Sequence, residues 1–285
     1  MLSHMHVRGI DLGVRDSGEG EPLVWGHGLL GSMEQEDEAG ALAWPSFGSS
    51  LRLIRYDARG HGSSEATLTP AAYRWPELAG DLLALLDAIQ LERAVLGGVS
   101  MGCATALHAA VQEPARATGL VLVAPPTAWH TRPRQARVYR FSSGLIERFG
   151  LRPFRLLGSL PLLAVRGGRL AAMQRATLDQ LEHADPRATI AALRGAAESD
   201  LPDPAALRRL AMPALVLAWA GDPVHPVSSA ERLGELLPDV ELHVAHSDDA
   251  LLEWPGVVRA FLGRTATPRP PAESPASSAP PPRPV

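Results

Sequence analysis

Two patterns of apolar and polar positions alternate along most of the chain. Short apolar runs predict buried strands, and longer segments with apolar residues three and four positions apart predict helices. The predicted strands cover residues 22–25, 51–57, 94–96, 119–124, 214–219 and 241–245, and the predicted helices cover 73–90, 101–111, 228–237 and 255–262. Residues 6–9 and 10–15 alternate with period two and predict a hairpin. Strands that alternate with helices predict an α/β fold with a mostly parallel sheet.

Residues 126–209 interrupt this alternation. The stretch is rich in arginine and leucine, and its pattern predicts several helices. We therefore expect a core made of residues 1–125 and 210–264, with 126–209 as a helical insertion. Residues 265–285 are mostly proline, serine and alanine without apolar periodicity, so we predict a disordered, proline-rich tail.

The composition allows a full-sized hydrophobic core and argues against several classes of protein. The chain has 285 residues, of which 46% are hydrophobic, and its formal net charge of -4 gives no general case for nucleic-acid binding. The single cysteine, Cys103, cannot form an internal disulfide and fits a reducing compartment. We expect no signal peptide, because the first residues lack a basic segment followed by an apolar one, and the apolar run 156–165 is too short to span a bilayer. The expected location is the cytoplasm.

The segment around Ser100 predicts a strand, an abrupt turn and a helix. The apolar run 94–96 leads into a pair of glycines, Ser100 follows, and small and apolar residues then recur at helical spacing. In the pattern Gly-x-Ser-x-Gly, Gly98 and Gly102 let the helix pass close to the strand while the serine is held at a strained apex. Such a hydroxyl can attack a carbonyl carbon, and the N–H of Met101 at the helix start points to where an oxyanion would form.

Four motifs, in this order along the chain, resemble those of the α/β-hydrolase family. They are His27-Gly28-Leu29-Leu30-Gly31-Ser32, Tyr56-Asp57-Ala58-Arg59-Gly60-His61-Gly62-Ser63, Gly98-Val99-Ser100-Met101-Gly102 and Ala220-Gly221-Asp222-Pro223-Val224-His225-Pro226. They match the family's oxyanion loop, the turn after its fourth strand, its nucleophile elbow and its acid loop after the seventh strand. The resemblance covers about residues 9–263 and implies an eight-stranded, mostly parallel sheet flanked by helices, with 126–209 as a helical cap.

The resemblance implies a role for individual residues of these motifs. Ser100 would be the nucleophile and Asp222 the acid that orients a histidine. The backbone N–H groups of Leu29 and Met101 would form the oxyanion hole.

Other polar residues are interpreted as structural. His27 and His61 are expected to shape the loops in which they lie, and His108, along the helix after Ser100, is expected to be packed. Asp57 is interpreted as a turn carboxylate, and the cluster Glu34-Glu36-Asp37-Glu38 as surface carboxylates.

The histidine of the triad is where the sequence departs from the family pattern. The family places it before a Leu-x-Glu-x-Pro-like segment, here residues 251–255, and the usual spacing falls on Asp248. We assign the base to His246, which directly follows the last strand and has no histidine downstream of it. His225 is the weaker candidate, because its closeness in sequence to Asp222 is expected to prevent it from bridging to the serine.

The expected function is that of a serine hydrolase that cleaves an ester, lactone or thioester through an acyl-enzyme, similar to enol-lactonases and esterases. Because the family histidine is displaced, a non-hydrolytic binding protein and a lyase or cyclase that uses the same pocket stay open as alternatives. We predict no metal and no cofactor, since neither metal-ligand spacing nor a Gly-x-Gly-x-x-Gly nucleotide motif is present.

The insertion also predicts what the substrate carries. Between Trp129 and Arg175 it holds ten arginines against one acid, Glu147. A positive potential of this kind attracts anions, so we predict a small-molecule substrate that carries a carboxylate or phosphate, or an acidic partner that delivers a thioester. The apolar run 156–165 suggests that the rest of the substrate is apolar. We expect no nucleic acid and no membrane span, and the sequence leaves a homo-oligomer open.

Overall fold

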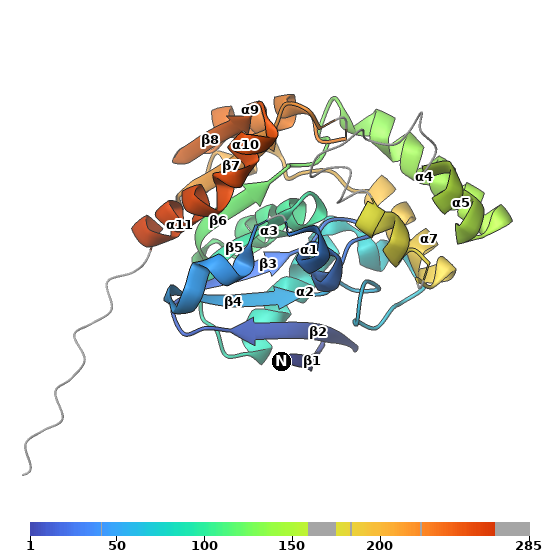
Figure 1. Cartoon of the computed structure of the whole chain (residues 1–285), viewed down its shortest axis with the longest axis horizontal. Helices are drawn as coiled ribbons and strands as arrows, with labels where there is room; N and C mark the ends of the chain where they lie inside the picture. The colour runs from blue at the N-terminus through green and yellow to red at the C-terminus, as the bar shows by residue number, and fades with distance from the viewer. Residues whose placement is uncertain (41, 159–174, 183, 223, 266–285) are drawn as a thin grey trace, which may run out of the picture.

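An eight-stranded sheet forms the centre of the computed structural model, which describes residues 1–40, 42–158, 175–182, 184–222 and 224–265 (Figure 1). The strands are β1 (Leu2–Val7), β2 (Ile10–Ser17), β3 (Glu21–Gly26), β4 (Leu51–Tyr56), β5 (Ala94–Val99), β6 (Ala117–Val123), β7 (Ala214–Trp219) and β8 (Val240–Ala245). Their order in the sheet is β1-β2-β4-β3-β5-β6-β7-β8. The pairs β1–β2 and β2–β4 are antiparallel, and the other neighbours are parallel. The predicted mostly parallel, eight-stranded sheet is confirmed.

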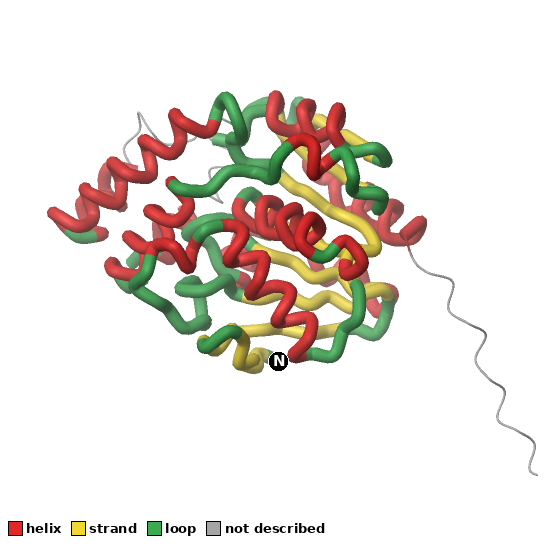
Figure 2. The backbone as a smooth tube through the Cα atoms, turned by 180° about the vertical axis from the view of Figure 1, so that it is seen from behind, coloured by secondary structure: helices red, strands yellow, loops and turns green. Residues whose placement is uncertain are grey.

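Helices cover both faces of this sheet (Figures 1 and 2). The larger hydrophobic cluster lies under α2 (Trp75–Ala88), α3 (Met101–Gln112) and α9 (Val227–Leu236). A second cluster on the opposite face includes Val258 and Phe261 of α11 (Trp254–Thr265) and Phe47 of the 3-10 segment η1 (Trp44–Ser50).

The strands at the centre of the sheet are mainly apolar because both of their faces are buried. In β3, Val24 belongs to the larger cluster, whereas Leu23 and Trp25 belong to the second one. In β5, Leu96 belongs to the larger cluster and Val95 belongs to the second one. Successive strand residues point to opposite faces, so a sheet covered by helices on both sides needs apolar residues at consecutive positions.

In the parts of the insertion between β6 and β7 that the structure describes, the secondary structure is mainly helical, as the sequence predicts. It contains α4 (Arg132–Phe149), α5 (Leu151–Gly158), a helical stretch over residues 175–180 and α7 (Pro186–Ala197). The short helix α8 (Pro204–Leu207) ends it, but Leu201 and Leu207 already pack into the larger cluster of the main core. The insertion therefore rejoins the core a few residues before the predicted boundary at 209.

The remaining elements are short. They are α1 (Met33–Ala39), η2 (Pro70–Tyr73), η3 (Pro114–Arg116) and α10 (Asp248–Leu252). None of the helices in the described ranges is both long enough and apolar enough to cross a membrane. Of the predicted tail, Thr265 is the last residue of α11, and 266–285 lie outside the described residues.

Candidate active site

Ser100 occupies a sharp turn between β5 and α3. Its backbone angles are φ 52° and ψ −102°, a conformation that is unfavourable for a residue with a side chain. The two flanking glycines are required by close packing against β3: a Cβ on Gly98 would lie 2.4 Å, and one on Gly102 2.0 Å, from the carbonyl oxygen of Gly26. The predicted strand, turn and helix around Ser100 are confirmed, and the serine is buried at 8% exposure.

His225 lies between Asp222 and Ser100 on the loop that follows β7. Its Nδ1 is 2.7 Å from Asp222 Oδ2, and its Nε2 is 2.9 Å from Ser100 Oγ. An ionised carboxylate only accepts hydrogen bonds, so Nδ1 carries the proton and Nε2 accepts the hydrogen of the serine hydroxyl. The three side chains form one continuous hydrogen-bond chain.

The expectation that His225 could not reach the serine is therefore wrong. The carboxylate of Asp222 accepts the backbone N–H of Val224 at 2.8 Å and that of His225 at 3.0 Å, both on Oδ1. This local turn folds the chain back on itself, so that the imidazole of His225 lies beside the second carboxylate oxygen. Two residues that are three positions apart can thus act as orienting acid and base.

His246, the histidine assigned to this place by sequence, is not brought to the serine. It is exposed just after the last residue of β8, and Ser100 Oγ is hydrogen-bonded by His225 instead. Asp248, at the family's usual position, is also exposed and begins α10 after the N-cap Ser247. The sequence analysis assigned His246 to this place, whereas the structure brings His225 to the serine.

The environment of Asp222 keeps its carboxyl ionised. Burial acts to raise the pKa of this carboxyl, but the hydrogen bond and charge of His225, together with the two backbone N–H donors, outweigh that effect. The net result is a pKa below the ordinary value of an aspartate. An ionised carboxylate at this position stabilises a positive charge on the imidazole.

The oxyanion loop, residues 27–32, passes directly beside Ser100. A Cβ on Gly28 would lie 3.8 Å from the Cβ of the serine. The loop turns tightly, with the N–H of Gly31 donating to the carbonyl of Gly28 at 3.0 Å and Leu30 held at φ 63°. Leu29 packs both against the main core and against the buried apolar residues of the insertion, so the insertion lies on this loop.

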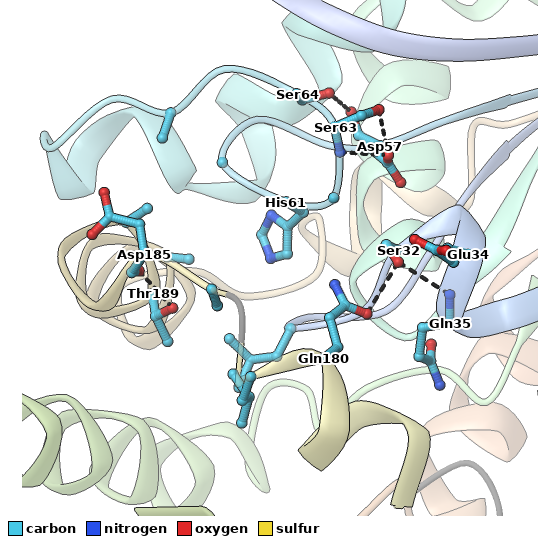
Figure 3. A pocket seen from close by; sticks show the side chains of 18 of the residues that line it. Ser32, Glu34, Gln35, Asp57, His61, Ser63, Ser64, Gln180, Asp185 and Thr189 are labelled. Carbon is cyan, nitrogen blue, oxygen red and sulfur yellow. Dashed lines mark hydrogen bonds between the residues drawn. The ribbon is translucent and has the colours of Figure 1, made fainter. Parts of the chain in front are cut away.

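Three histidines have structural contacts. His27 Nδ1 is 2.8 Å from the Gly28 carbonyl, and its Nε2 accepts the N–H of Ala58 at 2.9 Å, which ties the oxyanion loop to the turn after β4. His61 Nδ1 lies 2.8 Å from the Arg59 carbonyl, and its ring faces a cavity shown in Figure 3. His108 Nε2 contacts the carbonyl of Asp200 at 2.9 Å. The loop-shaping and packing roles predicted for them fit these contacts.

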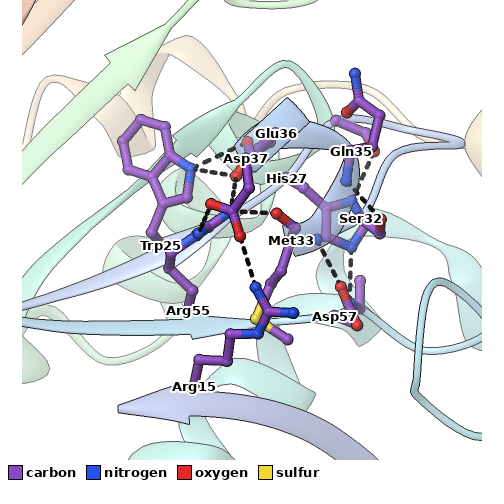
Figure 4. A network of polar contacts seen from close by, with 12 residues as sticks. Arg15, Trp25, His27, Ser32, Met33, Gln35, Glu36, Asp37, Arg55 and Asp57 are labelled. Carbon is purple, nitrogen blue, oxygen red and sulfur yellow. Dashed lines mark hydrogen bonds and ion pairs between the residues drawn. The ribbon is translucent and has the colours of Figure 1, made fainter. Parts of the chain in front are cut away.

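Asp57 is the turn carboxylate that the sequence predicts. It accepts the backbone N–H of Met33 at 2.8 Å, and both the N–H and the hydroxyl of Ser63 at 2.9 Å. It therefore holds the start of α1 to the turn after β4, as Figure 4 shows for the Met33 contact.

Glu36 is buried, which corrects its interpretation as a surface carboxylate. The indole N–H of Trp25 donates to both carboxylate oxygens at 3.1 and 3.2 Å, and Arg55 forms an ion pair with it at 3.2 Å (Figure 4). Burial raises the pKa of Glu36, although the charge of Arg55 opposes the rise. The ion pair joins α1 to β4 inside the protein.

The arginines of the insertion fall into several groups. Arg132 is buried, with its guanidinium stacked 4.2 Å from the ring of Trp75 and hydrogen-bonded to the carbonyls of Ser199 and Ala196. Arg194, further along the insertion, pairs with Glu147. Arg134, Arg137, Arg148 and Arg152 are exposed on α4 and α5, and Arg166 and Arg169 lie outside the described residues.

The described residues contain no group of three or more His, Cys, Asp or Glu side chains that could hold a metal ion.

Comparison with known proteins gives one consistent result. A family model described as an alpha/beta hydrolase fold matches residues 21–254. The chain is 31% identical to a putative carbamate hydrolase RutD of Variovorax paradoxus, over 91% of this chain and 98% of that protein. It is 30% identical to 3-oxoadipate enol-lactonase 2 of Acinetobacter baylyi, over 70% of each. Among solved structures, a thermophilic esterase from Thermogutta terrifontis superposes with a TM-score of 0.75 at 21% identity, covering 94% of this chain and 100% of the esterase.

Proposed function

We propose that this chain, which belongs to the α/β-hydrolase family, is a serine hydrolase with Ser100, His225 and Asp222 as its catalytic triad. The observation that carries the proposal is the unbroken hydrogen-bond chain from Asp222 through His225 to Ser100 Oγ. The histidine base that a serine nucleophile requires is therefore within hydrogen-bond reach. The alternative of a non-hydrolytic protein depended on the absence of such a base.

The mechanism follows from the position of each group. His225 Nε2 takes the proton of Ser100 as Oγ attacks the carbonyl carbon of the substrate, and Asp222 stabilises the resulting imidazolium through Nδ1. The N–H groups of Leu29 and Met101 donate to the oxyanion of the tetrahedral intermediate. His225 then gives its proton to the leaving alcohol or thiol, which produces an acyl-enzyme. Water attacks this ester with His225 again as the base, and the acid and free Ser100 are released.

The substrate class is an ester, lactone or thioester of a small molecule. The names of the relatives, an enol-lactonase and a putative carbamate hydrolase, support an acyl group bonded to oxygen or nitrogen. The anionic group predicted from the insertion stays a prediction, because Arg132 is a buried structural residue and the exposed arginines are spread over α4, α5, the stretch 175–180 and α7.

Ser100→Ala combined with a fluorophosphonate probe tests the proposal. The parent protein is expected to bind the probe covalently and to hydrolyse p-nitrophenyl acetate, and Ser100→Ala is expected to do neither, while its thermal unfolding is unchanged. Ser63→Ala, which removes another serine hydroxyl near the sheet edge, is the matched control and is expected to retain labelling. Labelling of Ser100→Ala at the parent rate would contradict the assignment of the nucleophile.

A further inference from the structure

A cavity of about 700 Å³ lies between the insertion and the core, and none of the triad residues is among the described residues that line it. One wall comes from the turn after β4, including His61 and Gly62, and another from Ser32 and α1. Residues 179–181 of the insertion, together with 184, 185, 188, 189 and 192, supply the opposite wall (Figure 3). The cavity is therefore separate from the hydrogen-bond chain at Ser100, although Leu30 and Ser32 of the oxyanion loop border it.

His61 presents an unused hydrogen-bond acceptor to this cavity. A carbonyl can only accept, so the contact with the Arg59 carbonyl places the ring proton on Nδ1 and leaves a lone pair on Nε2. The residue is only 6% exposed, and its Nε2 has no partner in the described part of the chain. Figure 3 shows the ring projecting between Thr189 on one side and Gln180 on the other. A buried polar atom without a partner is costly, and a ligand that donates a hydrogen bond would remove that cost.

Two hydroxyls of the walls add further acceptors beside His61. The hydroxyl of Ser32 donates to Gln180 Oε1 at 3.0 Å, and that of Thr189 donates to the Asp185 carbonyl at 2.9 Å. Because both hydrogens are already used, these hydroxyls offer only lone pairs to a guest. A guest that binds to His61 Nε2 and to these hydroxyls must therefore bring the donors.

The charges around the cavity favour a cation. Glu34, Glu38, Asp179 and Asp185 line it, and no basic side chain in the described ranges forms an ion pair with any of them. Arg15 is the single basic residue among the described lining residues, and it pairs with Asp37 outside the cavity. Four carboxylates gathered around one recess attract positive charge.

We propose that this cavity binds an organic cation with N–H donors, such as a protonated primary amine, with His61 Nε2 as its buried acceptor and the four carboxylates as its counter-charge. The ring can play this part at neutral pH, because burial, with the charge of His27 adding to it, lowers the pKa of His61 to about 4. The site goes beyond the proposed function, since it does not depend on Ser100. The cavity is expected to prefer a positively charged ligand, whereas the arginines of the insertion predict a negatively charged substrate.

Titration calorimetry with benzylamine, benzyl alcohol and benzoate tests the proposal. The three ligands are similar in size, and at neutral pH they are positively charged, uncharged and negatively charged, respectively. The protein used is full-length Ser100→Ala, so that the result is independent of hydrolysis. Benzylamine is expected to bind at least tenfold more tightly than the alcohol, and benzoate to bind more weakly than either. His61→Phe, which keeps a ring but removes the acceptor, is expected to weaken benzylamine binding about tenfold, the usual effect of losing a hydrogen bond to a charged group.

A second variant avoids any risk that a buried substitution unfolds the protein. Glu34→Gln combined with Glu38→Gln changes two exposed side chains. This double variant is expected to bind benzylamine more weakly and to show a smaller dependence of that binding on salt. The control Glu92→Gln, on a distant exposed loop, is expected to change neither the affinity nor its salt dependence. Equal binding of amine and alcohol, or binding that neither His61→Phe nor the double variant alters, would overturn the proposal. Benzylamine is also added to ester hydrolysis by the parent protein: competitive inhibition shows that the amine and the substrate exclude each other, and non-competitive inhibition shows that both bind at once. Loss of this inhibition in the double variant supports the site, and inhibition that the double variant leaves unchanged counts against it.

Discussion

Replacement of His225 by alanine removes the link between Asp222 and Ser100. The side chain is both the proton acceptor for Ser100 and the donor to Asp222. A positioned general base contributes about 10²–10⁴-fold to the rate, and the lost imidazolium–carboxylate interaction adds to this. We therefore expect kcat for p-nitrophenyl acetate to fall about 10³–10⁵-fold, which corresponds to roughly 4–7 kcal/mol of transition-state stabilisation.

The same substitution is expected to have a much smaller effect on folding. The His225 side chain is 21% exposed and makes two side-chain hydrogen bonds, each contributing about 0.5–1.5 kcal/mol. The carboxylate of Asp222 keeps the backbone N–H donors of Val224 and His225. The free energy of unfolding should therefore fall by only about 1–3 kcal/mol, so a loss of activity measured on the folded variant reports on chemistry.

His246→Ala is the matched control, because His246 is an exposed histidine at the end of a neighbouring strand. It is expected to leave both kcat and the unfolding midpoint unchanged. Added imidazole should restore part of the activity of His225→Ala, since the substitution vacates space beside Asp222. The reasoning is refuted if His225→Ala retains more than about a tenth of the parent kcat, a loss of only 1.4 kcal/mol, while His246→Ala loses most of it.

Three further predictions concern the surroundings of the site. Gly102→Ala should lower the free energy of unfolding in urea by about 3 kcal/mol or more, because its Cβ would lie 2.0 Å from the Gly26 carbonyl oxygen; Gly256→Ala, where nothing lies within 4 Å, should not be destabilising. His61 has a pKa of about 4 in the folded state, below its unfolded value of about 6.5, so the unfolded chain binds more protons and stability falls by roughly 3 kcal/mol as pH drops from 6.5 to 4. His61→Gln should flatten this part of the stability curve, and an unchanged curve would contradict the assigned protonation. For an anionic ester, kcat/KM should fall as ionic strength rises, and a flat response would count against an anionic substrate.

The sheet could be predicted because each strand is marked by a pattern of a few consecutive residues in the sequence. The strands of the parallel part contain short apolar runs, and the burial of both faces makes those runs nearly continuous in β5, β6 and β7. The elements missed, such as α1 (Met33–Ala39) and α10 (Asp248–Leu252), are too short to display a helical period and are defined by the N-cap residues Ser32 and Ser247.

Glu36 and His225 could not be placed correctly for a different reason. Glu36 lies in an acidic run that is typical of a surface helix, and it is buried because Trp25 and Arg55 come from two strands of the sheet to meet it. Charge patterning along the sequence carries no information on such partners. For His225 the missed signal was local: an aspartate that caps its own following turn brings the residue three positions later back to its side chain.

In the proposed triad, the acid Asp222 and the base His225 lie on one loop. The rest of the fold therefore has to fix only the position of this loop relative to Ser100. The distance between Asp222 and His225 is set by a short turn, so the catalytic geometry depends only on how that turn is held relative to Ser100. The sheet supplies this relation through adjacent strands: the N–H of Ser100 donates to the Val123 carbonyl at 3.1 Å, and the N–H of Ala124 donates to the Leu217 carbonyl at 2.8 Å. The elbow after β5 and the loop after β7 are thus connected across β6 by backbone hydrogen bonds. In the proposed triad the segment after β8 contributes no residue, and His246 and Asp248 are both exposed there.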